Sequence, residues 1–235
     1  MFPIRDNNPV ERTPHVTWFL IAANVVVFTV EMMLGLYQRS LEFRQFLYWF
    51  GAIPAEIVPR LLYPSEWFPW PMGTLFSSMF IHGGFMHLAG NMLFLYIFGD
   101  NVEDELGHGR FLLFYLLTGL AGSAVHIALG PNSTTPMVGA SGAISGIMGA
   151  YILLYPRARV MTLVFFFFIT VIEIPAYWFL AIWFGIQFMG GLNSIGSSGV
   201  GGVAFWAHVG GFMAGMGIIR LWIRYYGRSY IWWEQ

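Results

Sequence analysis

Cysteine is absent from this 235-residue chain, and charged residues are scarce. The lack of cysteine excludes disulfides, thiolate zinc sites and cysteine nucleophiles. Charged residues make up 10% of the sequence, against roughly 25% in soluble domains, while hydrophobic residues make up 57%. The net charge of −1 argues against a nucleic-acid partner. This composition indicates a membrane protein, and the length suits one compact domain.

The apolar residues gather in segments of helical length. A spanning helix needs about 20 mostly apolar residues. We therefore predict an all-α membrane protein with six spanning helices, at about residues 16–36, 79–99, 111–129, 141–155, 172–190 and 203–223. The fourth is short for a span, so part of its leaflet must be crossed by the loop before it. Non-helical backbone is tolerated at that depth only beside protein or a water-filled cavity, which places Ser141 in a pocket below the surface.

The connections between these segments differ in character. The acidic stretch 100–105 is interpreted as a turn after the second helix, and residues 160–170 as an apolar approach to the fifth. Residues 37–78 mix aromatic residues with proline and charge, which suits the lipid headgroup region. We expect this loop to lie half-submerged in one leaflet.

Arginine placement predicts the orientation in the membrane. Arg157 and Arg159 follow the fourth segment, and further arginines from Arg220 to Arg228 follow the sixth. By the positive-inside rule both of these ends are cytoplasmic, as are both termini of a six-helix chain. The predicted organisation is a cytoplasmic segment 1–15, a membrane domain 16–224 and a short cytoplasmic tail 225–235.

Polar residues from distant segments fall at a similar depth in the same leaflet. They are His82, His87 and Asn91 in the second segment, Ser141 at the start of the fourth and His208 near the start of the sixth. Polar groups inside a membrane are energetically costly and usually face the bundle interior or a cavity. One such histidine would more often be a packing residue, but five polar groups at matched depth indicate one site.

The chemistry of these side chains suggests their roles. A serine hydroxyl needs a base to remove its proton, and His208 is the candidate base for Ser141. No carboxylate is well placed as a third member, so we expect a Ser–His dyad. His87 and Asn91 are four residues apart and share a helix face, so with the Ser141 backbone N–H they could hold an oxyanion. His82 lies off that face and is assigned to the pocket mouth.

Small residues recur every four positions in the fourth and sixth segments. The pairs are Gly142 with Gly146, and Ala207 with Gly211 and Gly215. Such faces let helix backbones approach closely in lipid. Helices packed along them would bring Ser141 to His208.

The motifs His82-x4-His87-x3-Asn91, Gly139-x-Ser141-Gly142 and His208-x2-Gly211-x3-Gly215, in this order, resemble those of the rhomboid intramembrane serine proteases. The resemblance spans about residues 16–224. It implies a six-helix core and hydrolysis of transmembrane substrate proteins within the lipid bilayer. We expect no cofactor and no metal. It implies Ser141 as nucleophile, His208 as general base, and an oxyanion site of His87, Asn91 and the Ser141 N–H. By the same resemblance Gly139 lies beside that site, and Glu103 is a structural acid at the end of the second helix.

Two positions depart from the pattern of some family members. Gly73 and Thr74 stand where those members carry a Trp-Arg pair in the first long loop. Ser145 stands where others have an aromatic ring packed on the catalytic histidine, which leaves open what holds the ring of His208. From resemblance and glycine content, the fifth helix and the Gly/Ser-rich stretch 190–202 would form a gate for substrate. We expect a bacterial plasma membrane as the location.

Two other function classes are consistent with parts of the sequence. A small transporter or channel could use Glu31, Glu173, His82 and His87 as an ion path, but it would need polar groups on both sides of the membrane midplane. A non-catalytic binder of membrane proteins on the same fold would bind substrates without consuming them. The intact Ser–His pair argues against that binder.

Overall fold

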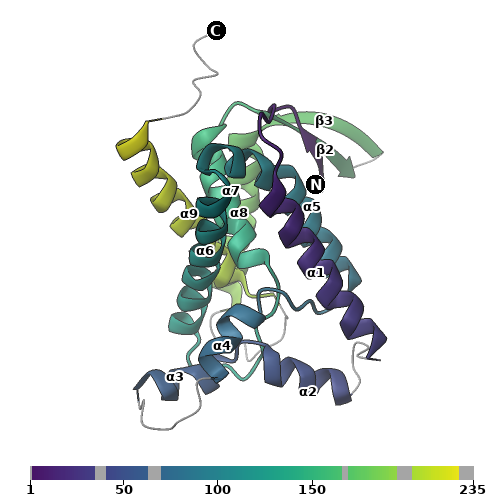
Figure 1. Ribbon diagram of the computed structural model, residues 1–235, viewed down its shortest axis with the longest axis vertical. Coiled ribbons are helices and arrows are strands. Elements are labelled where there is room, and N and C mark those ends of the chain that lie inside the picture. The colour runs from purple at the N-terminus through teal and green to yellow at the C-terminus, as the bar shows by residue number, and fades with distance from the viewer. Residues whose placement is uncertain (1, 35–40, 63–69, 166–168, 195–202, 228–235) are drawn as a thin grey trace.

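A computed structural model describes residues 2–34, 41–62, 70–165, 169–194 and 203–227 of the chain (Figure 1). Helices dominate this described part, and three strands form one sheet. In chain order the elements are β1 (Phe2–Asp6), α1 (His15–Met33), α2 (Leu41–Phe50), α3 (Pro54–Leu62), α4 (Trp70–Ser77), α5 (Phe85–Leu106), α6 (His108–Leu129), α7 (Ser141–Leu154), β2 (Arg159–Phe165), β3 (Ile169–Pro175), α8 (Ala176–Ser194) and α9 (Phe205–Tyr226).

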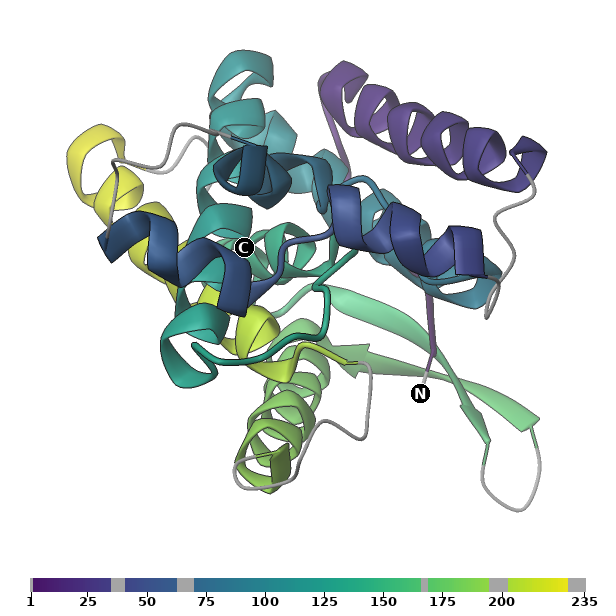
Figure 2. The ribbon, with the colours of Figure 1, turned by 90° about the horizontal axis from the view of Figure 1, so that it is seen from below.

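Helix α7 lies at the centre of the bundle. It packs against α5, α6, α8 and α9, and nearly all of its residues from Ala143 to Leu154 are buried. Helix α8 stands at the edge of the bundle, away from α1 (Figure 2). Helices α2 to α4 lie at one end of the molecule, and β1 and the end of α9 lie at the other.

Glycines allow α7 and α9 to pack backbone to backbone. A Cβ atom on Gly211 would lie 2.0 Å from the Gly142 carbonyl oxygen, and one on Gly215 would lie 1.9 Å from that of Gly146. Neither position can hold a larger residue without separating the helices. The close approach predicted from the spacing of small residues is confirmed.

The all-α prediction is wrong at the start of the fifth apolar segment. Residues 160–170, expected as an apolar approach, lie largely in a hairpin of β2 and β3, and α8 begins only at Ala176. The segment 1–15, predicted as a cytoplasmic segment before the first helix, contributes β1, which pairs antiparallel with β2. Residues such as Val160, Val164 and Val171 favour strand because their branched side chains suit a pleated surface.

The second predicted helix is displaced toward the C-terminus. It begins at Phe85, so His82 precedes it, and it continues through residues 100–105, which were predicted as a turn. Among those residues, Glu103 contacts the start of α1. Its carboxylate accepts hydrogen bonds from Val16 N at 2.8 Å and Thr17 N at 2.7 Å, where the first amides of a helix have no partner of their own.

The long aromatic loop contains three short helices in its described part. Helix α4 packs against α2 and α3, and an isolated bridge joins Ala52 to Met137 in the loop before α7. The Gly139 N–H donates to the Ser78 carbonyl oxygen at 2.8 Å. These contacts fix the loop that leads into Ser141. Residues 37–40 and 63–69 of the predicted submerged loop lie outside the described residues.

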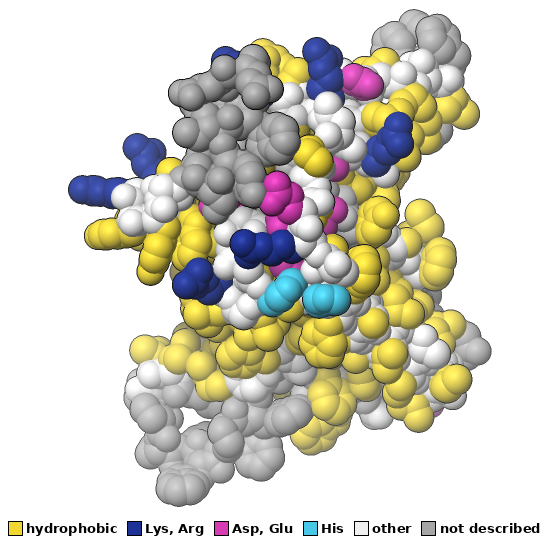
Figure 3. Space-filling view, turned by 45° about the horizontal axis from the view of Figure 1, so that its top comes forward, with side chains coloured by type: hydrophobic (Ala, Val, Ile, Leu, Met, Phe, Trp, Pro, Cys, Tyr) yellow, Lys and Arg dark blue, Asp and Glu magenta, His cyan; other side chains and the backbone are white. Residues whose placement is uncertain are grey.

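Two of the described helices, α1 and α6, are long and apolar enough to cross a membrane by length and composition, and α7 is a shorter apolar helix. The prediction of six spans is therefore not established by these criteria. Charged and histidine side chains gather at the end of the molecule that carries the sheet, with hydrophobic side chains beside them (Figure 3).

Candidate active site

Ser141 and His208 meet where the first turns of α7 and α9 lie side by side. The Ser141 hydroxyl oxygen is 2.7 Å from His208 Nε2, a hydrogen-bonding distance. Ser141 is the first residue of α7, and His208 is the fourth residue of α9. Close packing of the two helices brings together side chains 67 positions apart in the sequence. This geometry allows the imidazole to take the serine proton.

Gln187 of α8 holds the other nitrogen of the His208 ring. The distance from His208 Nδ1 to Gln187 Oε1 is 2.8 Å. An amide oxygen only accepts hydrogen bonds, so Nδ1 carries the proton and Nε2 is left free to accept the proton of Ser141. Gln187 was not among the residues predicted from the sequence. The sequence could have indicated Gln187, because it is the one strongly polar side chain between Ala176 and Leu192 in an otherwise apolar helix.

Trp183, one helical turn before Gln187 on α8, lies beside the same imidazole. The centroids of the Trp183 and His208 rings are 6.0 Å apart. Ser145 stands where some family members have an aromatic ring packed on the catalytic histidine. In this chain the aromatic neighbour of His208 comes from α8 rather than from α7. Ser145 instead donates from its hydroxyl to the Ser141 carbonyl oxygen at 2.5 Å.

His87 and Asn91 occupy the first two turns of α5, beside the loop that leads to Ser141. The Asn91 side-chain amide donates to the His87 carbonyl oxygen at 3.0 Å. Gly139 has φ +116°, a conformation that favours glycine, and a Cβ there would lie 2.7 Å from His87 Cε1 and 3.7 Å from Asn91 Nδ2. Glycine therefore lets both polar side chains approach the backbone two residues before Ser141.

His82 does not lie at the mouth of this site, contrary to the expectation. Its side chain is fully buried behind His87, with the two ring centroids 5.1 Å apart. The reason is the later start of α5, which leaves His82 in the preceding loop, turned toward α1. It lines a cavity together with residues of α1 and α5.

The carboxylates considered for an ion path do not form one. Glu173 lies on β3, where its side chain is 56% exposed and 3.9 Å from Arg159 Nε. Glu31 is buried in the cavity that His82 lines. The described residues contain no group of three or more histidine, aspartate or glutamate side chains that could hold a metal ion.

Comparison with known proteins gives one consistent result. A family model described as a Rhomboid domain matches residues 69–225, more than half of the chain. RHOMBOID-like protein 5 of Arabidopsis thaliana is 41% identical over 76 residues, covering 32% of this chain and 25% of that protein. Rhomboid protease GluP of Bacillus subtilis (strain 168) is 34% identical over 137 residues, covering 58% of this chain and 24% of that protein.

A third relative extends the comparison to a mitochondrial protein. Rhomboid protein 1, mitochondrial, of Saccharomyces cerevisiae is 33% identical over 96 residues, covering 39% of this chain and 28% of that protein. The chain thus spans only about a quarter of the length of these three relatives.

A serine and a histidine thus meet between two helices that glycines allow to pack closely, and this pairing of side chains is the one that serine hydrolases use. The chain belongs to the rhomboid family.

Proposed function

We propose that this chain is an intramembrane serine endopeptidase, which hydrolyses peptide bonds in or near transmembrane segments of membrane proteins. The observation that carries the proposal is the 2.7 Å contact between Ser141 Oγ and His208 Nε2, with Nδ1 of the same ring held by Gln187. Membership in the rhomboid family supports it, as does the printed name of the relative Rhomboid protease GluP.

The proposed reaction has two stages. Ser141 Oγ attacks the carbonyl carbon of the scissile bond while His208 Nε2 takes the hydroxyl proton. The imidazolium then gives this proton to the leaving amine, and an acyl-enzyme remains on Ser141. In the second stage a water molecule, deprotonated by His208, attacks the ester and releases the new carboxyl end. The hydrogen bond from Nδ1–H to Gln187 keeps the ring oriented through both stages.

The developing oxyanion requires hydrogen-bond donors beside Ser141. Ser141 begins α7, so its backbone N–H is among the helix amides without an intrahelical partner. The Asn91 amide uses one of its two N–H groups on the His87 carbonyl and keeps the other. The Asn91 amide and the His87 ring both lie close to Gly139, two residues before Ser141. This placement supports their assignment to the oxyanion site.

The six spanning segments are proposed as α1, α5, α6, α7, α8 and α9, within a membrane domain 16–224. β1 and the end of α9 lie at one end of the molecule, which supports placing both termini on the cytoplasmic side. Residues 228–235 of the proposed cytoplasmic tail lie outside the described residues. We propose a bacterial plasma membrane as the location. Two relatives come from Bacillus subtilis, while the names of others place them in mitochondria or chloroplasts.

Helix α8 is proposed as the gate through which a substrate segment enters. Its peripheral position and its few buried side chains support this role. Because α8 carries Gln187, its position also decides whether His208 is held. Residues 195–202 of the predicted gate loop lie outside the described residues.

Reconstitution of the purified full chain in proteoliposomes with a panel of single-span membrane proteins tests the proposal. Wild-type protein is expected to cleave at least one of them, whereas Ser141→Ala and His208→Ala are expected to cleave none. Ser123→Ala, a serine replaced within α6, and His15→Ala, at the start of α1, serve as matched controls that retain cleavage. Wild-type turnover by a folded Ser141→Ala variant would refute the proposal.

A further inference from the structure

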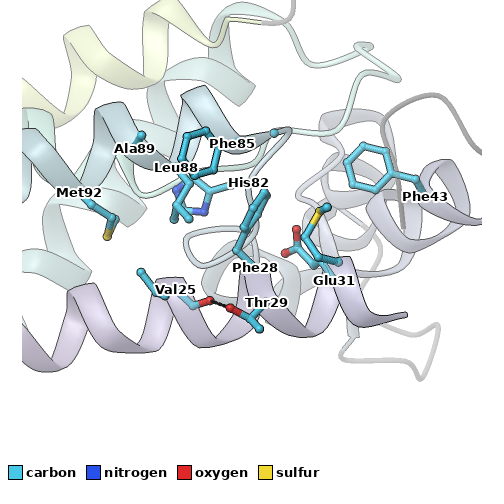
Figure 4. Close-up of a pocket in the computed structure, with 12 residues that line it drawn as sticks. Val25, Phe28, Thr29, Glu31, Phe43, His82, Phe85, Leu88, Ala89 and Met92 are labelled. Atoms are coloured by element: carbon cyan, nitrogen blue, oxygen red, sulfur yellow. Dashed lines mark hydrogen bonds between the residues drawn. The ribbon is translucent and has the colours of Figure 1, made fainter. Parts of the chain in front are cut away.

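A cavity between α1 and α5 lies outside the proposed active site. It has a volume of about 850 Å³ and is walled by Phe28 and Met32 of α1, Leu88 and Met92 of α5, and Phe43 of α2. Figure 4 shows α1 along one side and the segment that carries His82 and α5 along the other. We name it the α1–α5 cavity. Its volume falls within the range of about 300–1,000 Å³ that is typical of small-molecule sites.

Two polar side chains enter this apolar cavity without hydrogen-bond partners. Glu31 is 2% exposed and His82 is 0% exposed. Among the described residues, neither carboxyl oxygen of Glu31 and neither ring nitrogen of His82 has a partner at hydrogen-bonding distance. Leaving such groups unpaired is energetically costly, so the pair indicates a ligand that supplies hydrogen-bond donors.

The Glu31 carboxylate and the His82 imidazole together indicate which chemical group the polar end of the ligand carries. A carboxylate accepts hydrogen bonds only, and a neutral imidazole has one accepting nitrogen. A primary ammonium offers a positive charge and three N–H donors, enough for both residues. A carboxylate or phosphate end would meet Glu31 with like charge.

The position and size of the cavity favour a lipid over a protein helix. Glu31 is two residues from the end of α1, at the end of the molecule where α2 to α4 lie. In a spanning α1 this end meets the headgroup level. Phe85 and Met32 on the cavity wall are 68% and 41% exposed, so this wall reaches the surface of the protein. A 20-residue helix about 10 Å wide and 30 Å long would need on the order of 2,000 Å³, more than the cavity offers.

We propose that the α1–α5 cavity binds a bilayer phospholipid whose headgroup carries a primary amine, with the ammonium on Glu31 and His82 and an acyl chain along the apolar walls. The site adjoins the proposed active site, because the His82 ring packs on that of His87. Binding itself does not depend on the proposed protease function, so the experiment below measures binding rather than cleavage.

The probes are phosphatidylethanolamine and phosphatidylcholine with identical acyl chains, mixed equally in nanodiscs that hold the full chain. Lipid retained by the protein is counted by native mass spectrometry. The quaternary ammonium of phosphatidylcholine has the same charge but no N–H donor. Wild-type protein is expected to retain one phosphatidylethanolamine with at least about a tenfold preference, the factor expected for one charge-assisted hydrogen bond. Equal retention of the two lipids would overturn the proposal.

Three variants locate the site. Glu31→Gln keeps the size of the side chain and removes the charge, so the preference should vanish, whereas the same change at exposed Glu173 should leave it intact. Ala89→Phe fills the cavity and should abolish retention of both lipids. Wild-type preference in Glu31→Gln, or wild-type retention in Ala89→Phe, would place the lipid elsewhere and refute the proposal. Dodecylamine should displace the lipid from wild-type protein. Equal displacement by dodecanol would show that the amine is not recognised.

Discussion

At the residue scale, Gln187 fills the position of a third catalytic partner without a negative charge. Its Oε1 accepts from His208 Nδ1 at 2.8 Å, which selects the tautomer that Ser141 needs. In Gln187→Ala the ring loses this partner, and kcat is expected to fall about tenfold or more, equal to about 1.4 kcal/mol of transition-state stabilisation. Cleavage kinetics in proteoliposomes measure the effect.

Rescue separates positioning by Gln187 from general packing. Gln187→Glu retains an acceptor for Nδ1–H and should restore most of the activity, whereas Gln187→Leu fills the space without an acceptor and should not. Full activity in the leucine variant would show that the hydrogen bond is irrelevant to the reaction.

Gly139 controls how closely His87 approaches the backbone before Ser141. Its φ is +116°, and a Cβ atom added there would lie only 2.7 Å from His87 Cε1, which leaves no room for a side chain. Gly139→Ala is expected to lower stability by about 1–3 kcal/mol, the cost of a strained backbone, and to remove most of the activity. Thermal unfolding and cleavage are measured together. In Gly83→Ala the new Cβ would lie at an ordinary 3.8 Å from His87 Nδ1, so both properties should stay near wild type. Equal losses in the two variants would contradict this account of Gly139.

The catalytic candidates could be found from the sequence because they are polar residues in apolar segments. Ser141, His208, His87 and Asn91 share this property, and the glycine spacing predicted the helix contact that joins the first two. Gln187 is also a polar residue in an apolar segment. Its segment has no second strongly polar residue that would have shown which face of the helix points to the site. The position of His82 could not be predicted because the start of α5 depends on Gly84, where φ is 155° and the chain turns.

At the element scale, contact between α7 and α9 sets the distance between Ser141 and His208. Gly215→Ala would place a Cβ 1.9 Å from the Gly146 carbonyl oxygen. The helices must then separate, with an expected cost of about 1–3 kcal/mol and a parallel loss of activity. Unfolding in detergent and cleavage in proteoliposomes measure the two effects.

Gly217 on the same helix provides the control, because a Cβ there meets nothing within 4 Å. Gly217→Ala should leave activity unchanged and raise stability slightly, as alanine favours helix over glycine by roughly 1 kcal/mol. If both alanine variants behaved alike, close packing at Gly215 would not be the cause.

The sheet was the element least accessible to sequence reasoning. Residues 160–192 form one long apolar run, and its change from strand to helix at Ala176 falls inside the run. The partner that completes the sheet, β1, lies more than 150 positions earlier in the chain. Local patterns cannot reveal such a long-range pairing, although branched residues in 160–172 marked where strand was favoured.

At the scale of the whole molecule, Asp6 links the N-terminal strand to the central helix. Its side chain accepts a hydrogen bond from the Tyr151 hydroxyl of α7. Burial raises the pKa of Asp6 from 3.8 to about 6, and the hydrogen bond from Tyr151 opposes part of that shift. The folded state thus holds the Asp6 proton more tightly than the unfolded chain.

Stability from Asp6 is therefore greatest below pH 4 and is lost as the pH rises from about 4 to 6. The loss amounts to roughly 3 kcal/mol at most by proton linkage. In Asp6→Asn this component should disappear, so the variant should gain stability relative to wild type as the pH rises. Unfolding temperatures from pH 4 to 8 measure the difference, and parallel curves for the two proteins would contradict the assignment.

The central claim is that His208 activates Ser141 within a membrane-embedded bundle. The most direct measurement is labelling of the purified full chain with a fluorophosphonate probe, in detergent and in lipid, followed by mass-spectrometric mapping of the modified residue. The account predicts a single adduct on Ser141 that is lost in both Ser141→Ala and His208→Ala. An adduct on another residue, unchanged labelling of His208→Ala, or no labelling of folded wild-type protein in lipid would contradict it.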